Sequence, residues 1–492
     1  MLSRLCLFAL TLASVGLATP VIAGEPVYAV KACPADWPTG GHTVECGTLT
    51  VDEARDGRSN RRIEIAVATV RAGAPFRDAE GRTLPPVVVF HGGPGGALLP
   101  TLGRRLASYV GRPDAGGPLA AIDQDWIYFD QRGGGMGRPS LDCPDAEITD
   151  AGPPSDAAAA ALKACLKDWA DQGVDLNQYN ARAIAADIAD LRKAMGLDRI
   201  DLFGGSYGPR IEAAVITHAA EGVRAVVMDS PWPPEGNWAV GTPEQVSAAV
   251  RVILAKCAAQ PACAARHPDL QARFEAEARR WLAGPVRDAA GRTFTADDLA
   301  SFLMDTTYSN LGVRSFPADL ERIIGGDYAP VAAIAENRTG YYEGQHMAHL
   351  CKEELPFESA VAVAAGAAGD PVAEVLVPGL SRLFDVCAST AITPAAAIEN
   401  APVQTTIPTL FIAAEIDPGC PPHLTRKAAA GYQGSQVMIV TNATHGVTSN
   451  NACAARAARD FFRDPSRPVD QSCLPAPDAP LDFIEPAAAG IQ

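Results

Sequence analysis

The 492-residue sequence lacks the excess of basic residues that nucleic-acid-binding proteins carry. Asp and Glu number 57 against 41 Lys and Arg, which gives a formal net charge of −16, and no Lys/Arg tract interrupts this acidity. The sequence therefore excludes nucleic acid as a partner. Charged residues make up only 20% of the chain and hydrophobic residues 48%, so the chain is not disordered and can bury a large core.

Two further features are missing: a CxxC pair, and any long apolar stretch beyond the N-terminus. The first absence gives a zinc site little weight. The second excludes a membrane-spanning helix in the body of the chain. The sequence also gives no sign of a metal, nucleotide or redox cofactor.

The N-terminus combines Arg4, an apolar run over residues 5–18 and the tripeptide Val21-Ile22-Ala23. This order is typical of a secretory signal peptide that ends at Ala23. The alternative is a membrane anchor, but a run of about 14 residues is short for a span. Cys6 lies inside the run rather than just after it, which argues against a lipoprotein anchor. We expect residues 1–23 to be removed and the mature chain to be exported, free of the membrane, to the periplasm or the medium.

Twelve cysteines minus Cys6 leave eleven, and most should pair in an oxidising compartment. Connectivity cannot be deduced from sequence, so the pairing of sequence neighbours is a hypothesis. It leaves Cys420 unpaired and joins Cys33–Cys46, Cys143–Cys165, Cys257–Cys263, Cys351–Cys387 and Cys453–Cys473.

Eight short β-branched or apolar runs predict strands, at 44–51, 63–71, 87–90, 126–129, 200–203, 226–228, 409–413 and 436–440. Between them lie helical patterns, of which residues 181–195 are typical, with Asn180 as the cap and Gly196 as the stop. Alternating strands and helices predict a mainly parallel sheet covered by helices. From residue 233 to about 401 the sequence is mainly helical, which predicts an inserted cap between two parts of the α/β core, residues 24–232 and 402–492.

The predicted strand at 200–203 runs into Gly204-Gly205-Ser206-Tyr207-Gly208, a G-x-S-x-G pattern followed by a helical pattern. In this context the serine sits in a strained turn that lifts its hydroxyl clear of the sheet. Ser206 is therefore the candidate nucleophile. The alternative is a glycine-rich turn with a solvent-exposed serine.

The predicted strand at 87–90 runs into His91-Gly92-Gly93-Pro94-Gly95-Gly96. Such a loop can direct backbone N–H groups at a developing oxyanion. We expect Gly93 and Tyr207, the residue after the nucleophile, to supply these donors. A phosphate cradle is excluded because no Lys-Ser/Thr follows, and His91 is expected to brace the loop rather than act as a base.

The candidate general base is His445, which follows the last predicted strand. Asp417 and Asp229 both follow core strands and are candidates for the acid that orients it; Asp417 is favoured because prolines fix its loop. His346 and His349, spaced i and i+3, could belong to a metal site, but a polar helix face in the cap is the simpler interpretation.

The sequence resembles a family: the exported α/β-hydrolases related to proline iminopeptidase and bacterial tripeptidyl aminopeptidases. The motifs that carry the resemblance are His91-Gly92-Gly93-Pro94-Gly95, Asp130-Gln131-Arg132-Gly133, the serine pattern, Asp417-Pro418 and His445-Gly446. The resemblance implies an α/β-hydrolase fold, with a mostly parallel eight-stranded sheet and an inserted helical cap, and a serine exopeptidase acting on free peptide N-termini. Departures include Gly419-Cys420 after the acid, Pro209-Arg210 after the serine pattern, and Gly137 where a serine is usual.

The resemblance also implies a cap carboxylate that holds the α-ammonium of the peptide substrate. The segment Cys351-Lys352-Glu353-Glu354 is the candidate, with Glu353 as first choice and Glu354 as second. The alternative is a solvated acidic pair. Two other functions remain open: an esterase or amidase with the same triad and no amine anchor, and a binding protein on an inactive hydrolase scaffold.

Overall fold

The computed structural model describes residues 24–78, 80–108, 123–146, 152–336 and 341–484. The predicted signal peptide, residues 1–23, lies outside the described residues. Among those described, no helix combines the length and apolar character that crossing a bilayer requires.

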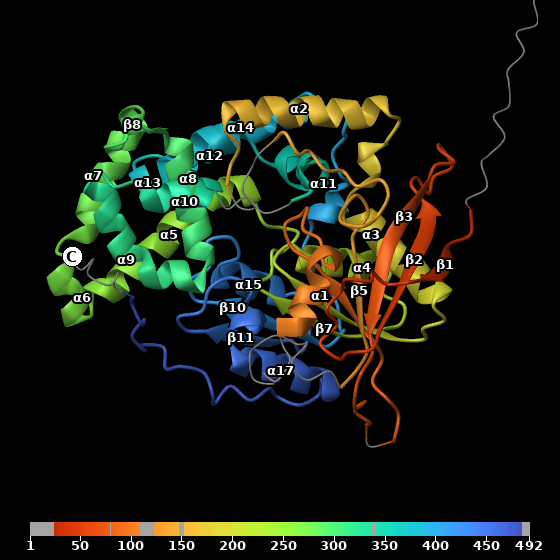
Figure 1. The fold of residues 1–492 in the computed structure, drawn as a ribbon. Coiled ribbons are helices and arrows are strands. Elements are labelled where there is room, and N and C mark those ends of the chain that lie inside the picture. Colours follow the sequence, from red (N-terminus) through yellow and green to blue (C-terminus); the bar gives the residue numbers. More distant parts are fainter. Residues whose placement is uncertain (1–23, 79, 109–122, 147–151, 337–340, 485–492) are drawn as a thin grey trace, which may run out of the picture.

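A nine-stranded sheet in the order β1-β2-β3-β5-β4-β6-β7-β10-β11 forms the centre of the fold (Figure 1). From β5 to β11 in that order the strands run parallel, whereas β1, β2 and β3 continue the sheet with antiparallel pairing. The strands are β1 (Val27–Lys31), β2 (Val44–Asp52), β3 (Arg62–Val70), β4 (Val87–Phe90), β5 (Trp126–Phe129), β6 (Ile200–Gly205), β7 (Val223–Asp229), β10 (Thr409–Ala414) and β11 (Gln436–Val440).

All eight predicted strands are present, but the predicted number of strands in the sheet is wrong by one. The strand that was missed, β1, lies at the edge of the sheet beside β2. Only one of its five residues is even partly buried, and the other four are exposed. A strand held mainly by backbone pairing has no buried side chains to impose an apolar pattern on its sequence.

Helices cover both faces of the sheet. On one face lie α3 (Ala181–Ala194), α4 (Gly208–His218) and α15 (Pro422–Ala429); on the other lie α1 (Leu99–Ser108) and α17 (Ala452–Arg463). The predicted helix at 181–195 is confirmed as α3: Asn180 caps it by accepting a hydrogen bond from the Ala183 N–H, and Gly196 follows its end with a φ of 67°. These layers form the α/β-hydrolase core.

The inserted cap follows β7 and precedes β10, and in Figure 1 it gathers away from the antiparallel edge of the sheet. It consists of α5 (Trp238–Ala258), α6 (Pro261–Arg266), α7 (Leu270–Ala283), β8 (Val286–Arg287), β9 (Thr293–Phe294), α8 (Ala296–Tyr308), α9 (Asn310–Ile324), α10 (Ala329–Glu336), α11 (Glu343–His349), a π-helical segment η3 (Leu350–Glu354), η4 (Leu355–Phe357), α12 (Ala360–Ala367), α13 (Pro371–Glu374), α14 (Val377–Ala388) and η5 (Ala397–Asn400).

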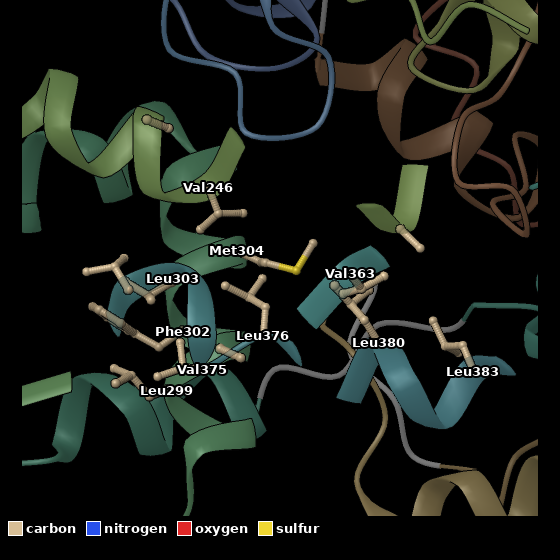
Figure 2. Close-up of a cluster of buried hydrophobic side chains, with 14 of the residues drawn as sticks. Val246, Leu299, Phe302, Leu303, Met304, Val363, Val375, Leu376, Leu380 and Leu383 are labelled. Atoms are coloured by element: carbon tan, nitrogen blue, oxygen red, sulfur yellow. The ribbon is translucent and has the colours of Figure 1, made fainter. Parts of the chain in front are cut away.

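The cap has its own apolar core. Figure 2 shows side chains of α8, such as Phe302 and Met304, in one cluster with Leu376 and, from α14, Leu380 and Leu383. Helix α2 (Asp156–Asp171), which precedes α3 in the chain, also belongs to this cluster through buried residues such as Leu162. In Figure 1 it lies alongside α14. The cap therefore draws on a segment outside the inserted stretch.

All five predicted disulfides are confirmed. The structure joins each proposed pair of neighbours and leaves Cys420 as a buried free thiol; the bonded pairs are Cys33–Cys46, Cys143–Cys165, Cys257–Cys263, Cys351–Cys387 and Cys453–Cys473. Two of them, Cys257–Cys263 and Cys351–Cys387, lie within the cap. Such bonds stabilise a fold mainly by restricting the unfolded chain.

Candidate active site

Ser206 occupies the turn between β6 and α4 with a φ of 64°. This left-handed conformation is strained for a residue with a Cβ, and it persists only where neighbouring contacts hold it. The Ser206 N–H donates to the Asp229 carbonyl at 2.9 Å, and the Ser206 carbonyl accepts from the Trp232 N–H at 3.1 Å. The turn is therefore fixed by the chain around the end of β7 and has the geometry that the G-x-S-x-G pattern predicts.

His445 follows β11, and its ring Nδ1 lies 2.8 Å from one oxygen of Asp417 and 3.0 Å from the other. Asp417, which follows β10, is only 2% exposed, and its Oδ1 accepts hydrogen bonds from the Gly419 and Cys420 N–H groups at 3.0 and 2.8 Å. Burial lowers the pKa of His445, but attraction to Asp417 and the hydrogen bond between them outweigh it, so the pKa is raised. The carboxylate thus orients the ring and favours its protonated form.

Asp229, the other acid candidate, holds the loop that carries His445 rather than its ring. Its carboxylate accepts from the Val447 N–H at 2.9 Å, and from the N–H and hydroxyl of Thr448 at 2.8 and 2.6 Å. Asp417 is the acid that is hydrogen-bonded to the imidazole.

Ser206 and His445 line the same cavity, which has a volume of about 440 Å³ and lies between the core and the cap. Its cap side is mostly apolar and includes Met304, Leu380 and Leu383, three members of the cluster in Figure 2. The carboxylates in its wall are Asp229 and Asp305, and the wall also contains Tyr308, Tyr341, Trp238 and Arg105. The volume is in the range of ordinary small-molecule sites.

The glycine loop after β4 lies against the nucleophile. A Cβ added at Gly92 would come within 2.5 Å of the Ser206 Cβ, so only glycine allows the backbone this close. Gly93 has a φ of 117° and lines the cavity. Tyr207, the other predicted donor, is the N-cap residue of α4. Gly93 therefore shares the cavity wall with Ser206, and Tyr207 directly follows Ser206 in the chain.

Two histidines, the partly buried His91 and the buried His346, contact carbonyl groups of this loop. His91 Nδ1 lies 3.0 Å from the Gly92 carbonyl, and His346 Nδ1 lies 2.7 Å from the Pro94 carbonyl. Burial lowers the pKa of each to about 4, so both rings are neutral near pH 7. His346 and His349 lie on α11 of the cap as predicted, but they are 9% and 0% exposed, so they do not form a polar outer face of that helix.

The motif Asp130-Gln131-Arg132-Gly133 is hydrogen-bonded to the same loop. Asp130 accepts hydrogen bonds from the Leu98 and Leu99 N–H groups at 2.9 and 3.0 Å, and Gln131 donates to the His91 carbonyl at 2.9 Å. The motif thus fixes both ends of the glycine loop.

The structure does not bring Glu353 and Glu354 to the cavity. Both are nearly fully buried, at 2% and 3% exposure, and neither belongs to its wall. Glu353 instead accepts a hydrogen bond from the Tyr207 hydroxyl, and Glu354 pairs with Arg210 at 2.8 Å. Glu353 also lines a second cavity of about 470 Å³, whose wall does not include Ser206.

Sequence reasoning missed one side chain that contacts the candidate triad. The ring of Tyr308, at the end of α8, packs edge-on against His445 at a centroid distance of 4.7 Å. Within the described chain, one group of three side chains offers ligand atoms within 4.8 Å of one another: Asp417, Cys420 and His445. Two of its members already form the imidazole–carboxylate hydrogen bond.

Residues 375–473, which include Asp417 and His445, match a family described as TAP-like protein. Tripeptidyl aminopeptidases of Streptomyces lividans and Streptomyces coelicolor (strain ATCC BAA-471 / A3(2) / M145) are each 27% identical over 209 residues, which is 40% of this chain. That alignment spans 37% of the length of these relatives.

Solved structures with similarity include a proline iminopeptidase from Mycobacterium smegmatis, at 14% identity and a TM-score of 0.39, over 85% of this chain and 97% of that one. An esterase from Thermogutta terrifontis is 16% identical with a TM-score of 0.37, over 84% and 97%. The features that identify the α/β-hydrolase fold in this protein are the strand order of its sheet and the serine turn between β6 and α4. The match over residues 375–473 supports a TAP-like family for this α/β-hydrolase fold.

Proposed function

We propose that this protein is an exported serine exopeptidase that hydrolyses the amide bond near the free N-terminus of a peptide. Its catalytic residues are Ser206, His445 and Asp417. The observation that carries the proposal is a strained serine and a carboxylate-paired histidine in the wall of one cap-covered cavity. Five disulfides support export, because such bonds persist in oxidising compartments.

In the proposed mechanism the Ser206 hydroxyl attacks the scissile carbonyl carbon while His445 takes its proton. Asp417 stabilises the resulting imidazolium. The N–H groups of Gly93 and Tyr207 bind the oxyanion of the tetrahedral intermediate. The C–N bond then breaks as His445 gives the proton to the leaving amine, and an acyl-enzyme remains. Water attacks that ester with His445 again as the base, which releases the acid and restores the serine.

Recognition of a free α-ammonium requires a carboxylate that faces the substrate. Glu353 and Glu354 do not line the cavity, whereas Asp305 does, from α8 of the cap. Asp305 lies three positions before Tyr308, so it shares the helix face whose ring contacts His445. We therefore assign the amine-binding role to Asp305 in place of Glu353 and Glu354.

The second candidate function is a carboxylesterase or amidase without amine recognition. The burial of Glu353 and Glu354 away from the cavity favours it, as does the apolar cap wall formed by Met304, Leu380 and Leu383.

A fluorophosphonate probe tests the nucleophile first. We expect covalent labelling of the wild-type protein and none of Ser206→Ala; equal labelling of the two would refute the assignment. Peptide arylamides with a free or acetylated N-terminus then separate the two functions. Preference for the free amine, lost in Asp305→Asn through a higher KM, supports the exopeptidase. Preference for the acetylated substrate supports the esterase or amidase.

A further inference from the structure

A buried polar cluster lies next to the nucleophile turn, and none of its members lines the cavity. It consists of Tyr207, Arg210, His349, Glu353 and Glu354, and we call it the elbow cluster. Their exposures are 4%, 2%, 0%, 2% and 3%. Tyr207 and Arg210 belong to the core, and the other three to the cap segment from α11 to η3. The cluster therefore joins the cap to the residue that follows the nucleophile.

Glu353 is the centre of this cluster. One of its carboxylate oxygens accepts a hydrogen bond from the Tyr207 hydroxyl, and the other accepts from the Ala181 N–H at 2.6 Å. His349 Nδ1 lies 2.8 Å from the same Tyr207 hydroxyl. Because a hydroxyl has one proton, donation to Glu353 leaves it free to accept a hydrogen bond from His349. The Tyr207 side chain is thus held at its tip by two groups of the cap.

The backbone around Glu353 is fixed as well. Arg210 donates to the Glu353 carbonyl at 2.9 Å and to the Pro234 carbonyl at 3.0 Å, and it pairs with Glu354 at 2.8 Å. The neighbouring Cys351 is disulfide-bonded to Cys387 of α14. The cap therefore presents the carboxylate of Glu353 to Tyr207 in one orientation.

The carboxylate is charged at neutral pH. Burial raises the pKa of Glu353, but the opposing effects of His349, Arg210 and Tyr207 outweigh it and lower the pKa to about 2. A permanent, buried anion whose two oxygens are already hydrogen-bonded is a firm acceptor for a phenol, and it is a poor receptor for a substrate ammonium.

We propose that Glu353 is a positioning residue: through the Tyr207 hydroxyl it fixes the backbone N–H of Tyr207 where the oxyanion develops. The inference rests on the proposed function, since it gives Glu353 a role in that same reaction. Ser206 holds a φ of 64°, and such strain requires support on both sides. The backbone bonds to Asp229 and Trp232 supply it at Ser206 itself. The elbow cluster supplies it one residue further on.

The test compares Glu353→Gln, Tyr207→Phe and the double variant. Each single variant should lower kcat about tenfold, less than the 10²–10³-fold that removal of an oxyanion donor itself costs. KM should change less than twofold. The rate of fluorophosphonate inactivation, which needs no substrate amine, should fall by the same factor as kcat. Because the two residues act through one hydrogen bond, the double variant should be no slower than the slower single variant.

Glu358→Gln is the matched control. Glu358 lies in the same stretch of the cap and accepts hydrogen bonds from the Ala239 and Val240 N–H groups at 3.1 and 2.6 Å, at the start of α5. Its loss should lower Tm and leave the inactivation rate unchanged.

Three results would overturn the inference. The first is a higher KM for free-amine peptides with normal inactivation, which would make Glu353 the amine anchor. The second is an additive double variant, and the third is an equal loss of rate in Glu358→Gln. Failure of the wild-type protein to label at Ser206 would instead refute the proposed function.

Discussion

Replacement of Asp417 by Asn separates the charge of this residue from its shape. The Oδ1 atom of Asp417 accepts hydrogen bonds from the Gly419 and Cys420 N–H groups, so the carbonyl oxygen of an asparagine must remain at that position. Its NH₂ group then takes the place of Oδ2, which lies 2.8 Å from His445 Nδ1. Because an NH₂ group only donates, it favours an Nδ1 atom that accepts, with the ring proton on Nε2; the competing contact from Nδ1 to the retained oxygen is the longer one, at 3.0 Å.

A ring protonated at Nε2 cannot take the proton of Ser206. We expect kcat to fall on the order of 10⁴-fold, the effect of the same wrong tautomer in other serine peptidases, or about 5.4 kcal/mol of transition-state stabilisation. KM and Tm should change little, because the substituted side chain keeps its size and the hydrogen bonds of its oxygen.

The measurement is steady-state turnover of an arylamide, with Tm as the check on folding. Asp229→Asn is the control. Both oxygens of the Asp229 carboxylate accept hydrogen bonds, Oδ1 from the Val447 N–H and Oδ2 from Thr448. An NH₂ group in place of either oxygen therefore loses the contact with Val447 or the contacts with Thr448. Compared with Asp417→Asn, this control should lower Tm by more and kcat by less. A folded Asp417→Asn protein within tenfold of wild-type kcat would refute the reasoning.

Three further predictions concern pH, the glycine loop and the cap. The pKa of His445 is raised above 6.5, and the ring must be neutral to act as a base, so the midpoint at which kcat/KM falls with decreasing pH should lie above pH 6.5. A midpoint below pH 6.5 would contradict the assignment. Gly92→Ala places a Cβ 2.5 Å from the Ser206 Cβ and should lower kcat about 100-fold by displacing the nucleophile, whereas unchanged turnover would show that the loop yields freely. Replacement of both Cys351 and Cys387 by Ala opens a link across 36 residues and should cost up to about 4 kcal/mol of unfolding free energy; an unaltered denaturant midpoint would exclude this.

The sequence was sufficient for the fold wherever a segment buries side chains. The strands at the sheet centre are compact apolar runs because helices cover both their faces. Such runs can be recognised as strands from the sequence alone. The edge strand β1 leaves no such pattern. Helix α2 shows a different limit: its apolar face is evident, but nothing in the sequence says that the face packs on α14 of the cap rather than on the sheet.

The candidate catalytic residues could be predicted because each depends on a local context. Ser206 needs only a strand before it and a helix after it, and Asp417 and His445 follow the ends of strands that are parallel neighbours in the sheet. The carboxyl ends of adjacent parallel strands meet at one edge, so proximity follows from topology alone. The choice between Asp417 and Asp229 rested on proline content, whereas the structure distinguishes them by which donors each carboxylate accepts.

The orientation of Glu353 depends on partners far away in the sequence: Tyr207 is 146 positions away and Ala181 is 172. One signal was nevertheless present. An arginine stands at position 210, where the start of α4 packs into the core. A guanidinium buried there needs anions, because an unpaired buried charge costs several kcal/mol. Two adjacent glutamates of the cap, Glu353 and Glu354, are those anions. The pair of acids and the buried arginine therefore explain each other.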